Sequence, residues 1–536
     1  MMRMTAFSKP NKLVIAISVA CWFPGTLFAA DLKFIPSIST TGYVYDTKTG
    51  DEPSTGTEAV SISPKLVSYF TGKRSNGSLV IENTTVEQSS SEPNTDKSFT
   101  ELSYSSGISI IENVLSLSLA GSQNYRVIDT SQSYISDKVL SSGDLSKVSS
   151  HNAQLSFVTP NPRYIGLAVQ SGYSKTKSNE TLGSLTNLNS EGYTASAQIY
   201  QGRGLQSLSF LLSSQFSDTK RESTSDLTST LTSANIGFKF TDDYSLIVTA
   251  TDREYDIDEN SITTANRQNL DTTSYGAGIR WQPTDDRFID ITYNNLDEGD
   301  NNSRYVGLNT QWAFSKRTFL GFTYDKNFYG DAYDMDFAYK LKSFKTQASY
   351  SESVTSYSRL SIVDGTSSLF VCPIGSTEFA ECFQPTSIEY VLQAGEEFRS
   401  LNSFTTDITD ETLFRKSGQI SFGYNKRRLS ASLNLNYNRT EYLESAREQD
   451  SRVATLNIAY QLGRRNDISL TTSYSTIDYS DTDRQNDVLN IRASLTRALS
   501  RDMKLTLSAR YVDRETEDDS RDITDSRLTA SINYRF

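Results

Sequence analysis

Apolar and polar residues alternate along most of the chain, in runs of about ten residues separated by polar turns. The last nine residues, 528–536, read LTASINYRF, so Leu, Ala, Ile, Tyr and Phe alternate with Thr, Ser, Asn and Arg. Side chains of an extended strand point alternately to its two faces. The pattern therefore predicts a strand with one apolar face and one wet face, as a wall between lipid and water requires.

Paired runs of this kind form a repeating hairpin. The runs 234–240 and 246–250 flank the short polar turn 241–244, and the arrangement recurs about every forty residues. Longer polar stretches, such as 88–97 and 252–272, separate one hairpin from the next. Further short turns are predicted at 75–77, 112–113, 160–162, 201–204, 283–286, 315–317, 425–428, 463–466 and 500–502.

Short turns that alternate with long loops are typical of outer-membrane barrels. After its first thirty residues, the sequence has no apolar run as long as a membrane helix, and a closed barrel is the other structure that satisfies its backbone in lipid. The sequence therefore predicts an all-β fold, a transmembrane antiparallel up-and-down β-barrel with periplasmic N- and C-termini. We expect about 24 strands, within a range of about 20 to 26.

Aromatic residues separate this prediction from a secreted soluble β-sandwich or propeller, in which apolar and polar residues would also alternate. A soluble core would be rich in Leu and Val, whereas the apolar faces here mix Tyr, Trp, Phe and Ala. Aromatic residues at strand ends are what a lipid-facing band needs at its two interfaces, so they favour the barrel. The tyrosines expected at strand ends are Tyr173, Tyr293, Tyr339, Tyr350, Tyr424, Tyr437, Tyr460, Tyr474 and Tyr511.

The amino-terminal region has the composition of a secretory signal. Basic residues precede an apolar run from Leu13 to Phe28, and Ala29 and Ala30 follow it. Residues 1–30 are therefore predicted to be a signal peptide, and residues 31–536 a single barrel in a Gram-negative outer membrane. The first strand is expected at 34–45, which leaves no room for an amino-terminal plug.

Charge is distributed by position. The net charge is −12, which argues against a nucleic-acid partner. Basic residues crowd the short turns and acidic residues crowd the long loops. This distribution predicts a basic periplasmic mouth that concentrates an anionic solute, although both rims could instead only keep the protein soluble and oriented. The residues of the predicted mouth are Arg280, Lys340, Lys342, Lys345, Lys504 and Arg535.

The predicted lumen is lined by small polar side chains. Ser430, Ser432, Asn434 and Asn436 fall on the wet face of one strand, and such a lining suits sugars or plain water. A barrel of 24 strands ~4.8 Å apart and tilted ~40° has a backbone diameter near ~48 Å. A pore of that width would leak unless something narrowed it.

One connection, at about 353–411, is far longer than the others and contains Cys372 and Cys382. In a compartment that permits disulfides, these two cysteines are predicted to pair. A bond that closes so short a loop would contribute roughly 2–3 kcal/mol. The loop either folds inward as a gate or stands outside the barrel, and the sequence leaves both alternatives open.

Enzyme chemistry has little support. His151 is the single histidine, and no nucleophile or oxyanion motif accompanies it. Metal-ligand clusters, phosphate loops and dinucleotide fingerprints are absent from the sequence, so we expect neither an enzyme nor a cofactor.

Two resemblances refine the interpretation. Tyr534 and Phe536 end a strand that resembles the closing strand of bacterial outer-membrane barrels, which implies a C-terminal assembly signal read by the barrel-assembly machinery. The segments FIPSIS at 34–39, YSESVTS at 350–356 and GRRN at 463–466 are similar to those of outer-membrane proteins associated with PEP-CTERM and exopolysaccharide loci. That resemblance implies a barrel that passes polymer outward beside a periplasmic polysaccharide-export protein. The cysteine pair departs from the pattern of this family.

The expected function is therefore an outer-membrane channel for export of a surface exopolysaccharide. The alternatives are a general diffusion porin and a surface adhesin or structural barrel that conducts nothing. The expected partners are outer-membrane lipid and lipopolysaccharide, the assembly machinery, a polysaccharide substrate and a periplasmic export protein.

Overall fold

The structure is a computed structural model of the chain. It describes residues 31–51, 53–89, 97–127, 145–178, 189–222, 226–257, 271–297, 302–356, 369–373, 396–400, 412–443, 447–480, 484–517 and 522–536. The predicted signal peptide, residues 1–30, lies outside these ranges.

The described chain is built from β-strands. Their bounds are β1 Asp31–Thr49, β2 Thr55–Thr71, β3 Ser75–Gln88, β4 Lys97–Ile111, β5 Leu115–Val127, β6 Leu145–Val158, β7 Ile165–Ser178, β8 Ser190–Gln201, β9 Leu208–Arg221, β10 Leu227–Lys239, β11 Tyr244–Ile257, β12 Thr272–Thr284, β13 Arg287–Asp297, β14 Asn302–Ser315, β15 Thr318–Asn327, β16 Gly330–Lys340, β17 Phe344–Ser356, β18 Leu369–Pro373, β19 Glu396–Ser400, β20 Thr412–Lys426, β21 Leu429–Tyr442, β22 Glu448–Gln461, β23 Asn466–Tyr479, β24 Arg484–Ala498, β25 Met503–Thr516 and β26 Ile523–Arg535.

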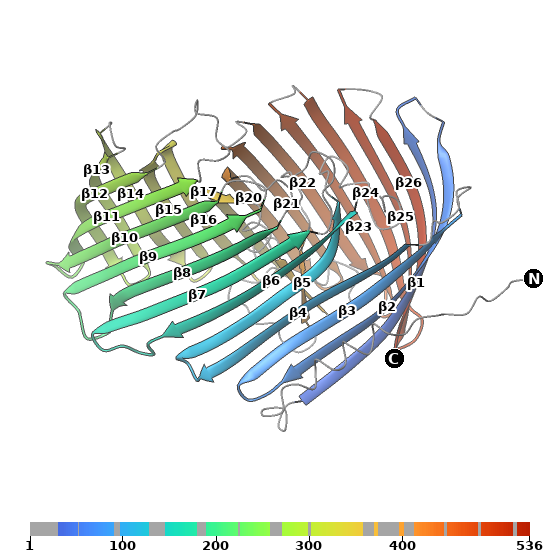
Figure 1. The fold of residues 1–536 in the computed structure, drawn as a ribbon, viewed down its shortest axis with the longest axis horizontal. Helices are drawn as coiled ribbons and strands as arrows, with labels where there is room; N and C mark the ends of the chain where they lie inside the picture. The colour runs from blue at the N-terminus through green and yellow to red at the C-terminus, as the bar shows by residue number, and fades with distance from the viewer. Residues whose placement is uncertain are drawn as a thin grey trace, which may run out of the picture.

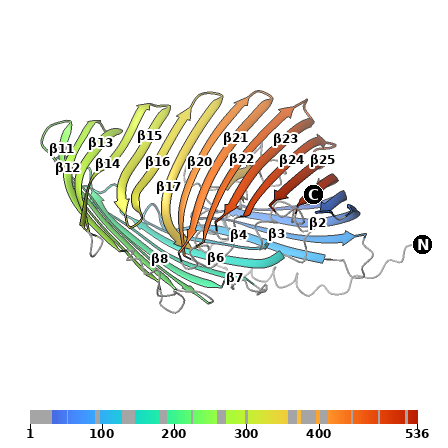
Figure 2. The ribbon, with the colours of Figure 1, turned by 90° about the horizontal axis from the view of Figure 1, so that it is seen from above.

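Twenty-four of these strands form one closed antiparallel barrel, which confirms the predicted fold class and strand number. Each strand pairs with the next along the chain, and β17 pairs with β20. Strands β18 and β19 form a separate hairpin between β17 and β20. Figures 1 and 2 show tilted strands around one axis. Among the described residues, no helix is long and apolar enough to cross a membrane.

The barrel closes where the first strand meets the last. Strand β1 pairs with β26 from Ser37 opposite Arg535 to Thr49 opposite Ile523, and it pairs with β2 along its other edge. In Figure 1 the blue β1 and the red β26 lie side by side. No strand of the barrel therefore has a free edge in the described chain.

Strand connections differ at the two ends of the barrel. The end that holds Asp31 and Arg535 carries the short connections, such as 285–286 and 427–428, and is called the turn end below. The opposite end, called the loop end, carries the long ones, among them the connection from β17 to β20, together with the short connection 328–329 between β15 and β16. This alternation is the one that the sequence predicts.

Several boundaries differ from the prediction, and two of them show why. Strand β1 spans Asp31–Thr49 rather than 34–45. The predicted turn at 75–77 belongs to β3, because the chain turns earlier, where the Gly72 N–H donates to the Ser75 carbonyl. Gly77 instead lies opposite Phe70, where an added Cβ would approach the Phe70 ring to 2.5 Å. This glycine accommodates a neighbouring aromatic ring and does not form a turn.

The outer face of the barrel carries a continuous apolar band. Leu246, Ile279 and Ile291 stand opposite one another on β11, β12 and β13, and about half of each side chain is exposed. Exposed aromatic residues border the band toward the loop end and toward the turn end, as an outer-membrane barrel requires. Toward the loop end these residues are Tyr193, Tyr275, Tyr293, Tyr333, Tyr474 and Tyr511, and toward the turn end they are Phe238, Tyr244, Trp281, Phe314, Tyr424, Tyr460 and Tyr534.

Buried apolar side chains gather near the loop end of β1–β6. The cluster comprises Tyr45, Ala59, Val86, Phe99 and Leu145. Phe99 and Tyr125 meet edge to face there, with ring centroids 5.0 Å apart. This cluster stabilises one end of the wall and leaves the middle of the inner face to polar residues.

Candidate transport lumen

The inner face of the barrel is lined by hydroxyl and amide groups. On β21, Asn434 and Asn438 are buried on the face opposite the exposed Leu435. Hydrogen bonds join neighbouring strands on this inner face. The Asn457 amide donates to Ser432 Oγ at 3.4 Å, and Thr471 Oγ1 donates to Asn457 Oδ1 at 2.9 Å. The predicted wet residues Ser430, Ser432, Asn434 and Asn436 follow the same alternation along β21.

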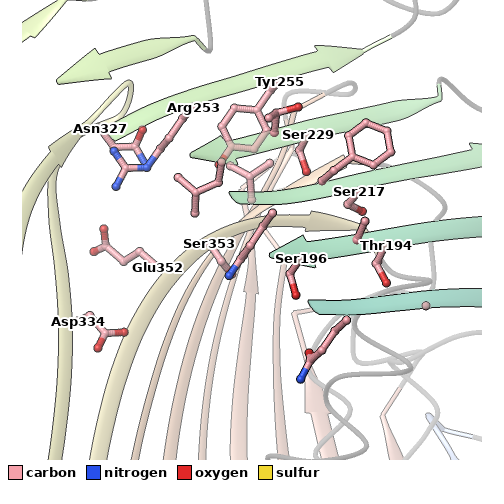
Figure 3. Close-up of a pocket in the computed structure, with 18 of the residues that line it drawn as sticks. Thr194, Ser196, Ser217, Ser229, Arg253, Tyr255, Asn327, Asp334, Glu352 and Ser353 are labelled. Carbon is pink, nitrogen blue, oxygen red and sulfur yellow. The ribbon is translucent and has the colours of Figure 1, made fainter. Parts of the chain in front are cut away.

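A cavity lies in the lumen between two parts of the wall. Its volume is about 730 Å³, and its lining comes from β6–β11 on one side and from β15–β17, with the loop residue Tyr329, on the other. Figure 3 shows Thr194, Ser196, Ser217 and Ser229 on the first side. The second side contributes charged and amide groups. These include Asn327, Asp334 and Glu352.

Arginines of β11 and β12 are matched by carboxylates. Arg280 and Asp290 lie opposite each other, and the guanidinium donates to both Asp290 oxygens at 2.7 Å. The Asp290 side chain is 3% exposed, so this bidentate pair is largely shielded from water. Arg280 also lies over the Phe288 ring, 4.6 Å from its centroid. The pair therefore ties β12 to β13 inside the wall.

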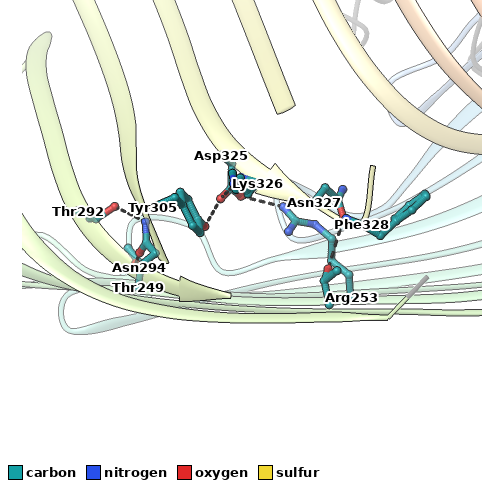
Figure 4. Close-up of polar contacts among 10 residues, drawn as sticks. Thr249, Arg253, Thr292, Asn294, Tyr305, Asp325, Lys326, Asn327 and Phe328 are labelled. Carbon is teal, nitrogen blue, oxygen red and sulfur yellow. Dashed lines mark hydrogen bonds and ion pairs between the residues drawn. The ribbon is translucent and has the colours of Figure 1, made fainter. Parts of the chain in front are cut away.

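A second arginine on this wall also meets a carboxylate, which comes from a strand that is not its neighbour in the sheet. Arg253 Nη2 lies 3.1 Å from Asp325 Oδ2, and the Tyr305 hydroxyl donates to Asp325 Oδ1. Figure 4 shows the contacts running from β14 through β15 to β11. Next to Asp325, Asn327 Oδ1 accepts hydrogen bonds from Thr272 Oγ1 at 3.3 Å and from the Phe328 N–H at 3.0 Å. We call the region β11–β15 the matched wall.

Strands β24–β26 carry arginines in a different arrangement. Arg492 lies opposite Arg510, and Arg510 lies opposite Arg527, so the three form one row across neighbouring strands. Because strands are ~4.8 Å apart, the row spans roughly 10 Å of wall. The adjacent Tyr511 and Leu528 are exposed on the outer face, which places the arginines on the inner face. We call Arg492, Arg510 and Arg527 the arginine row.

The end of the row nearest β1 packs against acidic and aromatic groups. Arg527 Nη2 lies 3.6 Å from Asp525 Oδ2, and the guanidinium lies over the Tyr45 ring, 5.4 Å from its centroid. The Arg527 side chain is only 4% exposed. Like charges directly opposite each other destabilise a sheet, and the Asp525 carboxylate beside Arg527 offsets part of that repulsion.

The six basic residues of the predicted mouth do not form one group. Exposed Lys340, Lys342 and Lys345 cluster at the turn between β16 and β17, where Lys340 lies opposite Lys345. Exposed Lys504 and Arg535 lie at the turn ends of β25 and β26, on another part of the rim. The structure places Arg280 with Asp290, away from both clusters.

The remaining predicted residues are placed as follows. Tyr534 and Phe536 meet edge to face at 4.9 Å, and the Phe536 N–H donates to the Pro36 carbonyl at 3.0 Å. Cys372 falls in β18, but Cys382 lies outside the described residues, so the disulfide stays a prediction. His151 lies on β6, where Nδ1 is 3.0 Å from the Tyr104 hydroxyl.

Comparison with known proteins adds a family for the closing part of the barrel. Residues 446–536, which hold β22–β26 and the arginine row, match the family described as "Putative beta-barrel porin 2". A search of curated proteins found no match. The chain is therefore a closed β-barrel of the outer-membrane type whose closing part is similar to a family of putative barrel porins.

Several solved structures are similar over most of the chain, at low identity. The siderophore receptor PirA from Pseudomonas aeruginosa is 7% identical, with a TM-score of 0.38 over 93% of this chain and 80% of that chain. The FrpB iron transporter from Neisseria meningitidis is 10% identical, with a TM-score of 0.42 over 93% and 82%. OccK8 (OprE) from Pseudomonas aeruginosa is 9% identical, with a TM-score of 0.33 over 94% and 98%.

No group of three or more metal-ligating side chains occurs within the part of the chain that the structure describes. The features of the lumen that sequence reading missed are the arginine row and the cavity. Alternation with the apolar Ile491 and Ala493 could have assigned Arg492 to the inner face, but only the register shows which residues stand opposite it.

Proposed function

We propose that the protein is a passive outer-membrane channel and that its cargo is a surface exopolysaccharide carrying negative charge. The loop end would face outward, and the turn end, which holds Asp31 and Arg535, would face the periplasm. A periplasmic polysaccharide-export protein would dock at the turn end, near Lys340, Lys342 and Lys345. Outer-membrane lipid and lipopolysaccharide would surround the apolar band.

The observation that carries this proposal is the arginine row in a lumen lined by hydroxyls and amides. Clustered cations in a confined wall raise the local concentration of anions. Serine, threonine and asparagine side chains offer many weak hydrogen bonds, which hold a hydrated polymer without trapping it. This combination favours an acidic polysaccharide over a neutral or cationic solute.

The test is conductance and ion selectivity of the refolded protein in planar bilayers, with wild type beside R492Q/R510Q/R527Q. We expect wild type to prefer anions and the variant to lose that preference by a factor of about ten. Dextran sulfate should block wild type more strongly than neutral dextran of equal length, and the variant should not distinguish them.

A matched control places the same loss of charge elsewhere. K340Q/K342Q/K345Q removes three positive charges at the turn end and leaves the arginine row intact. We expect it to keep most of the anion preference. A wild-type channel without ion preference would favour the general diffusion porin. A wild-type protein without conductance would favour an adhesin or structural barrel, provided that deletion of residues 360–401 does not open it.

That deletion tests whether the long connection acts as a gate. If the long connection closes the pore, removal of residues 360–401 should convert a nearly closed wild type into an open channel. Equal conductance of wild type and the deletion variant would contradict a gate formed by this connection. It would not contradict the proposal that the barrel is a channel.

A further inference from the structure

The wall of the barrel bends sharply between β11 and β15, which have β12–β14 between them. Arg253 of β11 contacts Asp325 of β15 at 3.1 Å, and Thr272 of β12 donates a hydrogen bond to Asn327 of β15 at 3.3 Å. In a round barrel with a backbone diameter near ~48 Å, strands four places apart would lie roughly 24 Å from each other. An arginine and an aspartate cannot bridge that distance, so the wall departs from a circle here. In Figure 2, β11–β14 lie together at one end of the barrel.

A glycine of β12 permits the bend. Gly278 lies opposite Ile247 of β11, whose side chain is fully buried. A Cβ added at Gly278 would lie 1.9 Å from the Ile291 carbonyl oxygen of β13, which is a backbone atom. The two strands that flank β12 are also joined directly, because Thr249 Oγ1 of β11 donates to Asn294 Oδ1 of β13 at 3.2 Å. The bend is therefore built into the wall itself.

Four aromatic residues extend this contact across the loop end. The Phe328 ring, in the turn between β15 and β16, lies 6.0 Å from the Tyr255 ring of β11 and 6.2 Å from the Phe414 ring of β20, measured between centroids. Tyr329 also packs on Phe414, with centroids 4.1 Å apart, and Phe414 is buried. We call Tyr255, Phe328, Tyr329 and Phe414 the aromatic clasp.

The aromatic clasp joins strands that a round barrel keeps far apart. Strands β11 and β20 are seven places apart, with β12–β17 between them. In a round barrel they would be separated by roughly 38 Å, whereas here a single phenylalanine ring connects their side chains. The cavity described above agrees, because β6–β11 and β15–β17 line one space of about 730 Å³. The lumen is therefore pinched on this side, toward the loop end.

We infer that the aromatic clasp divides the lumen near the loop end and confines the transport path to the part bordered by β1–β5 and β20–β26. The inference rests on the proposed channel function and extends it. The arginine row belongs to β24–β26 and so lies beside this path. Asp334 and Glu352 line the cavity on the other side of the division, so an acidic polymer would pass the arginines rather than these carboxylates. The clasp also narrows a pore that would leak at its full width.

The test is single-channel conductance of the refolded full-length protein in planar bilayers, with wild type beside F328A/Y329A. Removal of both rings should rejoin the two parts of the lumen. Conductance should then rise by up to about twofold, since half of the 24 strands would border the path again. A second variant, D325N, weakens the contact with Arg253 and leaves the turn residues unchanged, and it should also raise conductance.

A matched control removes the same two residue types from another turn. Phe240 and Tyr244 flank the turn between β10 and β11, and both rings are exposed on the outer face. F240A/Y244A should therefore conduct as wild type does.

Two isosteric charge changes locate the path. N436D places a carboxylate on β21, beside the inferred path, and N152D places one on β6, in the cavity. We expect N436D to lower the anion preference in reversal-potential measurements and N152D to leave it near that of wild type. Equal effects of the two changes would overturn the confinement of the path.

The conductance experiment separates this inference from the proposed function. Equal conductance of wild type, F328A/Y329A and D325N would overturn the division of the lumen and leave the channel in place. Absence of conductance in all three proteins would overturn the channel and, with it, the inferred path. Conductance in F328A/Y329A beside a closed wild type would support the clasp as the element that closes the pore.

Discussion

Arginine occurs on two parts of the inner wall and has a different neighbour in each. In the matched wall, Arg280 meets Asp290 and Arg253 meets Asp325. In the arginine row, Arg510 stands between Arg492 and Arg527. A cross-strand pair such as Arg280 and Asp290 stabilises the sheet that holds it, whereas like charges directly opposite each other oppose it. The comparison teaches that the register, rather than residue type, decides which side chain stands directly opposite an arginine, a carboxylate at Arg280 and another arginine in the row.

The largest effect is expected from breaking a matched pair. Asp290→Ala leaves the Arg280 guanidinium, which is 16% exposed, without its carboxylate. Loss of one partner of a buried pair costs about 3 kcal/mol of unfolding free energy. Urea unfolding of the refolded protein would measure this loss. R280M/D290L should restore most of the stability, and a loss below about 1 kcal/mol in Asp290→Ala would place the pair with ordinary surface ion pairs.

Removal of the central arginine of the row should have a smaller effect on stability. Arg510→Gln relieves repulsion from two like charges, which offsets the contacts that it loses, so we expect a change within about 1 kcal/mol. The same variant should lower the anion preference measured in planar bilayers. A loss of stability as large as that of Asp290→Ala would show that the row is a structural element and would remove the difference between the two walls.

A rise in salt concentration should weaken the effect of the arginine row more than that of the Arg280–Asp290 pair. A rise from 0.1 to 1 M KCl shortens the Debye length from about 10 to about 3 Å. The anion preference of the arginine row should shrink several-fold in reversal-potential measurements. The cost of Asp290→Ala should persist, because the bonded atoms of that pair are in contact and shielded. Equal salt sensitivity of both effects would contradict this distinction.

The smallest effect concerns an acid at the rim of the matched wall. Asp286 lies in the turn between β12 and β13, where a hydrogen bond from Thr284 Oγ1 lowers the pKa of its carboxyl. Its contribution to stability is therefore present above the unfolded pKa of about 3.9 and is lost as pH falls through the lower folded pKa. The unfolding midpoints of wild type and Asp286→Asn should converge in acid. A constant difference from pH 6 to pH 2 would argue against this linkage.

The sequence predicts most of the fold because alternation and turn spacing are local. The hairpins around 241–244 and 427–428 follow from runs of about ten residues and need no long-range information. The turn at 75–77 was misplaced because Gly77, which suggests a turn by composition, serves instead to accommodate the Phe70 ring. Local pattern therefore determines strand number better than strand boundaries.

The candidate site depends on geometry that no local pattern contains. Alternation places Arg510 on the inner face, but its position opposite Arg527 depends on the register between β25 and β26. The cavity brings Ser217 of β9 near Glu352 of β17, and this proximity follows from the curvature of the closed barrel. Sequence reading predicted a lumen lined by hydroxyls and amides with a basic mouth, and it could not locate where the charges and cavities of the lumen gather.

The junction of β1 with β26 has a consequence for how the molecule assembles. Every other junction of the barrel joins strands that follow one another along the chain, with only the β18–β19 hairpin interposed between β17 and β20. The entropic cost of bringing two segments together grows with the length of chain between them. It is therefore largest for the step that pairs β1 with β26. We expect assembly to proceed as a growing curved sheet whose two edge strands have unpaired backbone groups. These edges could pair with another chain until β1 meets β26 and closes the barrel.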